Sequence, residues 1–179
     1  MQQKIKMVLP VEGTGFPQHR SVNEAVNVLF VCHDNCALSL MAESILRSVG
    51  AARFEAYSAG AVRDGSIDPD VLEFLGQHRL PVNGLWSKRL DHFRLPGAPH
   101  IDFIITLCDT AASERFSDWP DRPFVAHWNL ETSKNADDAL RDSFWTLMRR
   151  IKTFASLPHG KVNRRVLERR ALTLQASHL

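Results

Sequence analysis

The chain has 179 residues and a formal net charge of +2, with 44% hydrophobic and 23% charged residues. This length and composition suit one globular domain with a substantial core. The net charge is too small to argue for nucleic acid, and no apolar run is long enough to span a membrane, so we expect neither as a partner. Because the N-terminus shows no signal peptide, we expect a cytoplasmic protein whose thiols stay reduced.

Four apolar segments predict β-strands, at residues 26–31, 53–58, 101–107 and 123–128. The first, VNVLFV, is almost unbroken and apolar, as expected for a parallel strand that is buried on both faces. Helices are predicted from Leu38 to Val49, after Asp68-Pro69, from Ser87 to Phe93 with a serine cap, and from Leu140 to Phe154. Strands that alternate with helices predict an α/β fold with a parallel sheet and helices on both faces.

The domain organisation follows from where this pattern begins and ends. Residues 1–22 lack periodicity and form an N-terminal extension, residues 23–160 form the domain, and residues 161–179 form a basic C-terminal tail. We expect the tail to be a solvated helix.

Two of the three cysteines directly follow predicted strands. Cys32 ends the first strand and Cys108 the third, so both belong at the carboxyl edge of the sheet, where ligands bind in such folds. The loop after Cys32 leads into a helix N-terminus, whose N–H groups and dipole attract anions and stabilise a thiolate. Ser39 could hydrogen-bond that thiolate or cap the helix.

The segment VLFVCHDNCALSLMAE, residues 28–43, resembles the signature of the low-molecular-weight protein-tyrosine phosphatases and, more closely, that of the related thiol-dependent arsenate reductases. Further likenesses follow in order at Ser58-Ala59-Gly60, at Ser87-Lys88, and at residues 104–120 and 127–133. The resemblance covers roughly residues 26–157 and implies a flavodoxin-like fold with a four-stranded parallel sheet in the order 2-1-3-4.

The resemblance also implies site residues and partners. Cys32 would be the nucleophile, Ser39 its support and Cys108 a resolving thiol. The anion loop would consist of His33, Asp34, Asn35, Cys36, Ala37 and Leu38. The substrate would be a small oxyanion, phosphate or arsenate, or a phosphotyrosine peptide. Thioredoxin, or a glutathione- or mycothiol-type thiol, would be the reductant, with no cofactor, in a monomer or homodimer.

The sequence differs from the family pattern at the positions that bind the oxyanion and supply the general acid. Leu38 stands where the family has an arginine that clamps the oxyanion, and Asp34 stands where it has glycine. Thr132 replaces the general acid aspartate, with Glu131 one position away as a weak substitute. Loss of an oxyanion donor costs about 10²–10³ in rate and loss of a general acid roughly 10²–10⁴, so we expect impaired activity. Arg63 is a nearby cation, but an ordinary surface arginine is the favoured interpretation.

Two alternatives stay open. The protein could be a non-catalytic thiol sensor or a binder of a soft metal or As(III), through Cys32, Cys36, Cys108 and His33, because soft ions favour thiolates and imidazole. A redox pair could also form between Cys32 and either Cys36 or Cys108. The third redox cysteine of the arsenate reductases is absent, because Phe116 stands at its position.

Overall fold

The structure is a computed structural model that describes residues 25–50, 53–120, 122–130, 136–156 and 163–176. The predicted N-terminal extension, residues 1–22, lies outside the described residues. Within the described ranges, no helix is both long enough and apolar enough to cross a lipid bilayer.

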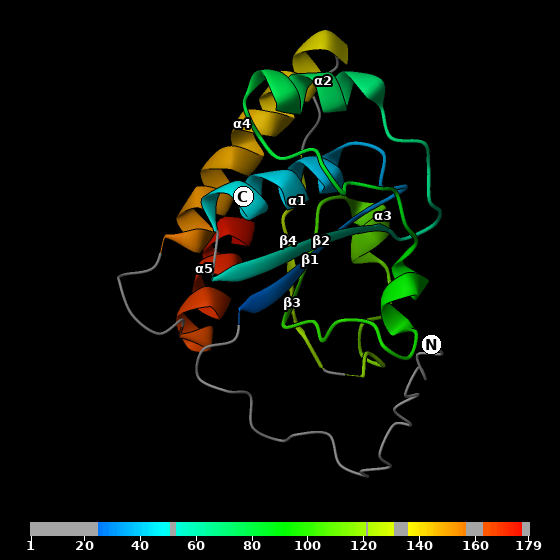
Figure 1. Ribbon diagram of the computed structural model, residues 1–179. Coiled ribbons are helices and arrows are strands. Elements are labelled where there is room, and N and C mark those ends of the chain that lie inside the picture. The colour runs from blue at the N-terminus through cyan, green and yellow to red at the C-terminus, as the bar shows by residue number, and fades with distance from the viewer. Residues whose placement is uncertain (1–24, 51–52, 121, 131–135, 157–162, 177–179) are drawn as a thin grey trace, which may run out of the picture.

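A four-stranded parallel sheet forms the centre of the molecule (Figure 1). Its strands are β1 (Val26–Cys32), β2 (Phe54–Gly60), β3 (Phe103–Thr106) and β4 (Phe124–His127). They lie in the order β2-β1-β3-β4, which confirms the predicted topology. Strand β1 is central and pairs with both β2 and β3, so the loop that follows it emerges in the middle of the sheet edge.

Helices connect the strands. They are α1 (Leu38–Val49), α2 (Pro69–Gln77), the 3₁₀ helix η1 (Leu90–Arg94), α3 (Asp109–Ala112), α4 (Ala136–Ala155) and α5 (Arg164–Ala176). Helix α2 begins as predicted, because the carboxylate of Asp68 accepts the N–H of Asp70 and Pro69 is the first helical residue. The predicted serine cap at Ser87 is wrong. The turn begins after Arg89, and Ser87 instead contacts the loop after β1.

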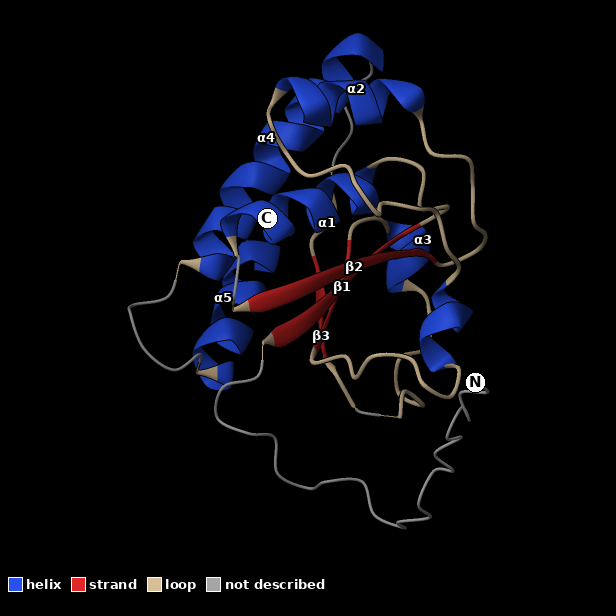
Figure 2. Cartoon of the chain, viewed as in Figure 1, coloured by secondary structure: helices blue, strands red, loops and turns tan. Residues whose placement is uncertain are grey.

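Helices and turns lie over both faces of the sheet (Figure 2), and buried apolar side chains form one core cluster on each face. Alternate residues of β1 point to opposite faces, so Val28 and Phe30 pack in one core cluster while Leu29 and Val31 pack in the other. The first cluster includes side chains of α1, α2, α4 and α5, and the second includes side chains of η1 and α3. This explains why the β1 sequence is apolar at every central position.

Helix α5 belongs to the core, which differs from the solvated tail that the sequence suggested. Leu167 and Ala171 are fully buried in the first core cluster. The indole Nε1 of Trp128 donates a hydrogen bond to the carbonyl oxygen of Ala171 at 3.0 Å. The basic residues of α5 lie around this buried stripe, and their number masked it in the sequence.

Candidate active site

Cys32 lies at the carboxyl end of β1, buried beneath the N-terminus of α1. Its Sγ lies 2.8 Å from Oγ of Ser39 and accepts the backbone N–H of Asn35 at 3.3 Å. The side-chain amide of Asn35 donates to the same Oγ of Ser39 at 2.8 Å, so the serine hydroxyl proton is left for the sulfur. Two donors, the hydroxyl of Ser39 and the N–H of Asn35, therefore converge on the sulfur of Cys32.

Asn35 organises the loop around that thiol. Its backbone has φ 55, a left-handed conformation that asparagine tolerates better than most residues. Its amide nitrogen also donates to Oγ of Ser58 at 2.9 Å, and its Oδ1 accepts the N–H of Lys88 at 2.9 Å. The loop is thereby pinned to β2 and to the segment before η1.

A buried ion pair extends this network away from Cys32. The hydroxyl of Ser58 donates to the carboxylate of Glu43, which is fully buried in α1. The ammonium of Lys88, only 5% exposed, lies 3.5 Å from Oε2 of Glu43, and Arg47 pairs with Oε1. Burial lowers the pKa of Lys88, and the charge of Glu43 partly offsets that effect. In the sequence, Glu43 and Lys88 stand only within the segments that resemble the family.

One feature of the sequence indicates the buried ion pair of Glu43 and Lys88. Glu43 falls within the apolar stripe of α1, beside Ala42 and before Ile45. A carboxylate on a buried helix face requires a charged or hydrogen-bonded partner. The identity of that partner, Lys88, depends on a contact between residues 45 positions apart, which periodicity does not reveal.

Cys36 has surroundings opposite to those of Cys32. Its sulfur points toward the carbonyl oxygen of Asp34 at 3.7 Å and packs on Gly65, where an added Cβ would lie only 2.1 Å from Sγ. Burial, followed by the hydrogen bond and charge of Asp34, raises the pKa of Cys36 to about 11. Cys36 is therefore protonated near neutral pH and is a poor nucleophile.

Cys108 lies directly before α3 and is half-buried. Burial raises the pKa of its thiol most, and the nearby charge of Cys32 adds to this, while hydrogen bonds from backbone N–H groups of Ala111, Thr110 and His33 oppose it. The effect of the His33 N–H on this pKa indicates that Cys108 lies near the anion loop. The two cysteines thus share one edge of the sheet, as their positions after β1 and β3 predicted.

The remaining loop residues differ in exposure. His33 is exposed, while Asp34, Ala37 and Leu38 are half-buried. Leu38 packs with Ala37 against the first core cluster, so the position that would carry the family arginine is filled by an apolar contact.

The segment before the predicted acid is held by α4. Arg150 is buried, and its Nη1 donates to the carbonyl oxygens of Trp128 at 3.0 Å and Asn129 at 3.5 Å. Burial lowers the pKa of Arg150 to about 10. The amide of Asn129 donates to Oδ1 of Asp109 at 2.6 Å, next to Cys108. Glu131, predicted as a weak acid, lies outside the described residues.

The metal alternative receives no support from the side-chain arrangement. Within the described part of the chain, no three histidine, cysteine, aspartate or glutamate side chains are grouped so that they could hold a metal ion. Cys32, Cys36, Cys108 and His33 all lie in the described part of the chain and do not form such a group.

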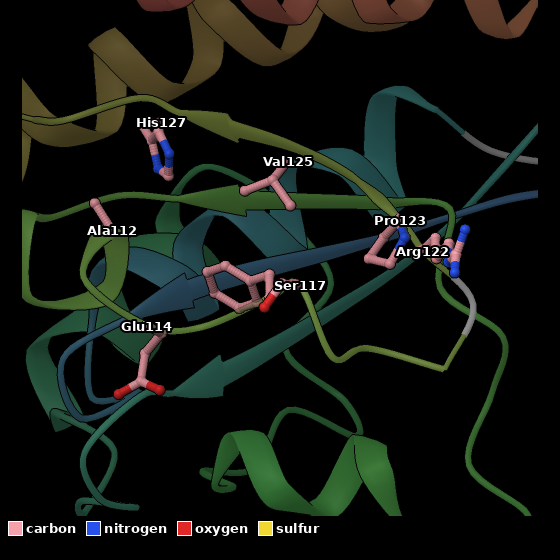
Figure 3. Close-up of a pocket in the computed structure, with 8 residues that line it drawn as sticks. Ala112, Glu114, Ser117, Arg122, Pro123, Val125 and His127 are labelled. Atoms are coloured by element: carbon pink, nitrogen blue, oxygen red, sulfur yellow. The ribbon is translucent and has the colours of Figure 1, made fainter.

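A cavity of about 410 Å³ lies beside β4, away from this loop (Figure 3). Its lining includes Glu114, Ser117, Arg122 and His127 but no residue of the anion loop. The imidazole of His127 is engaged by Thr106, with Nδ1 to Oγ1 at 2.7 Å. The cavity is therefore separate from the thiol site.

Fold and site together define a class: a flavodoxin-like α/β protein with a thiol at the end of its central strand, under a helix N-terminus. The family model for low molecular weight phosphotyrosine protein phosphatase matches residues 27–122, more than half of the chain. The chain belongs to this family.

Proteins to which this chain is similar include arsenate reductases. The glutaredoxin arsenate reductase of Synechocystis sp. is 25% identical over 104 residues, covering 58% of this chain and 76% of that protein. The arsenate reductase of Oceanobacillus iheyensis is 24% identical over 125 residues, covering 70% and 86%. The crystal structure of arsenate reductase from Archaeoglobus fulgidus superposes with a TM-score of 0.60 at 26% identity, covering 73% of this chain and 99% of that one.

Proposed function

We propose that this protein is a thiol-dependent enzyme that reduces arsenate and, as a secondary activity, cleaves phosphate esters, with Cys32 as the nucleophile. The observation that carries the proposal is the environment of Cys32 at the N-terminus of α1. Its sulfur is hydrogen-bonded to the hydroxyl of Ser39 and accepts the backbone N–H of Asn35. The names of its relatives as arsenate reductases support arsenate as the oxyanion.

The reaction would use two thiols in sequence. The Cys32 thiolate attacks the arsenic of arsenate, an S–As bond forms, and an oxygen leaves as water after protonation. The Cys108 thiolate then attacks the sulfur of Cys32, so that an S–S bond forms and the electron pair of the S–As bond goes to arsenic, which leaves as arsenite. An external thiol reductant, thioredoxin or a glutathione- or mycothiol-type thiol, reduces the Cys32–Cys108 disulfide and resets the enzyme.

Cys108 is the favoured resolving thiol for two reasons. The N–H of His33 and the charge of Cys32 both act on the pKa of the Cys108 thiol, which supports a position of this thiol near the anion loop. The competing thiol, Cys36, keeps its proton because its pKa is raised to about 11. A disulfide between Cys32 and Cys36 is therefore the less favoured variant.

We expect turnover to be slow. An aliphatic side chain at Leu38 supplies no charge to the developing oxyanion, and removal of such a donor costs about 10²–10³ in rate. A missing general acid at Thr132 would cost roughly a further 10²–10⁴, unless Glu131 replaces it.

The test is an arsenate-dependent assay coupled to thioredoxin and its reductase, run beside hydrolysis of p-nitrophenyl phosphate. Cys32→Ser should abolish both activities. Cys108→Ser should abolish arsenate reduction and leave ester hydrolysis, whereas Cys36→Ser should leave both. If the wild-type chain shows neither activity above Cys32→Ser, the proposal is wrong and the thiol-sensor alternative takes its place.

A further inference from the structure

The anion loop contains a negatively charged side chain, the carboxylate of Asp34. The carboxylate of Asp34 accepts the backbone N–H of Cys36, with Oδ1 at 3.3 Å from the nitrogen. That N–H belongs to the set of loop donors that an oxyanion bound above Cys32 would use. In the free protein, a side chain of the loop therefore occupies one of the donors on which substrate binding would depend.

A second segment, residues 60–65, runs along this loop and is tied to it by backbone hydrogen bonds. The N–H groups of Ala61, Val62 and Gly65 donate to the carbonyl oxygens of residues 32, 33 and 34 at 2.8, 3.0 and 2.8 Å. At Gly60 an added Cβ would lie 1.9 Å from the carbonyl oxygen of Arg63, so only glycine permits this close approach. The backbone of Arg63 is thus fixed beside the anion loop.

The Arg63 side chain leans toward the loop. Its Nη2 lies 3.8 Å from Oδ2 of Asp34, while the side chain is 65% exposed. Its positive charge also acts on the Cys36 thiol, whose pKa it lowers slightly against the larger raising effects. A guanidinium is therefore present at the rim of a loop whose own arginine position holds Leu38.

We propose that Arg63 supplies the cation for a bound oxyanion, and that in the free protein the carboxylate of Asp34 pairs with Arg63 and keeps its guanidinium beside the loop. On binding, the oxyanion would displace the Asp34 carboxylate from the Cys36 N–H, and Arg63 would exchange its carboxylate partner for the oxyanion. The exchange is easy because an exposed ion pair contributes little stability, whereas a guanidinium forms strong forked hydrogen bonds to oxyanions. This inference rests on the proposed function and adds to it a cation that is recruited from outside the loop.

Oxyanion affinity can be measured without turnover. Inorganic phosphate or arsenate bound above Cys32 should protect its thiol from iodoacetamide, so the concentration that halves the alkylation rate gives the apparent Kd. Arg63→Ala should weaken this protection about tenfold or more, as expected for loss of one charge-assisted contact, and Arg63→Lys should retain part of it. Asp34→Asn should strengthen it severalfold, and Asp34→Asn combined with Arg63→Ala should lose most of that gain.

Arg164→Ala is the matched control, because Arg164 is also exposed and paired with a carboxylate, Glu168, but lies in α5. Equal protection in Arg63→Ala and wild type would overturn the role of Arg63 and leave the proposed function standing. Weaker protection in Asp34→Asn would overturn the role of Asp34. If neither anion protects Cys32 in any variant, both this inference and the proposed function are wrong. Far-UV circular dichroism of each variant checks that the fold is retained.

Discussion

Replacing Lys88 by methionine removes the positive partner of a fully buried carboxylate. The ammonium of Lys88 lies 3.5 Å from Oε2 of Glu43, and neither side chain is more than 5% exposed. Removal of one partner from a buried pair costs about 3–5 kcal/mol, because it leaves an uncompensated charge. Arg47 still pairs with Oε1, so we place the loss of unfolding free energy at the lower end, about 3 kcal/mol.

The measurement is urea unfolding at pH 7, followed by far-UV circular dichroism. The double variant Lys88→Met with Glu43→Gln should be less destabilised than the sum of the single variants by about 1 kcal/mol or more, because a neutral amide needs no counter-charge. Glu168→Gln, which breaks the exposed pair with Arg164, should cost less than about 1 kcal/mol. Additive single effects, or a loss below about 1 kcal/mol in Lys88→Met, would refute the reasoning.

Three further predictions concern other parts of the molecule. At pH 8, Cys36 should react with iodoacetamide roughly 100-fold more slowly than an ordinary thiol, because its pKa is raised from 9.0 to about 11, and peptide mapping of the alkylated protein checks this. The contribution of the Cys36 thiol to stability should be complete below pH 9 and be lost as the pH rises toward 11, which unfolding measured as a function of pH checks. Leu167→Ala should cost about 2–5 kcal/mol in urea unfolding, whereas Leu172→Ala, at a 48% exposed position, should cost well under half as much. Arg150→Met should lower the unfolding free energy by about 1–3 kcal/mol, since two carbonyl oxygens lose their donor, and an unchanged urea midpoint would contradict this.

The fold was predictable because its main signals are local. The apolar run of β1 indicates a strand buried on both faces, and Asp68-Pro69 marks a helix start through backbone chemistry within three residues. Helix α3 was missed because four residues are too few to show helical periodicity. The burial of α5 was missed because Leu167 and Ala171 are few among many charged neighbours.

The site was predictable to the extent that it follows the chain. Cys32, Asn35 and Ser39 lie within eight consecutive residues, and a strand–loop–helix unit brings them together. The contributions of Lys88 and Arg63 depend on how other segments pack against that unit, and no local pattern encodes them. The raised pKa of Cys36 likewise follows from packing, which its spacing from Cys32 does not reveal.

The position of Trp128 beneath α5 has a consequence for synthesis of the protein. The ribosome makes the four strands and helices α1 to α4 before it reaches Leu167 and Ala171 of α5, which pack on the Trp128 side. Until those residues leave the exit tunnel, the indole N–H of Trp128 lacks its acceptor and the indole lacks the side chains of α5, although Phe30 and Phe154 already pack against its ring. The core around Trp128 is therefore completed only when the last helix has been synthesised.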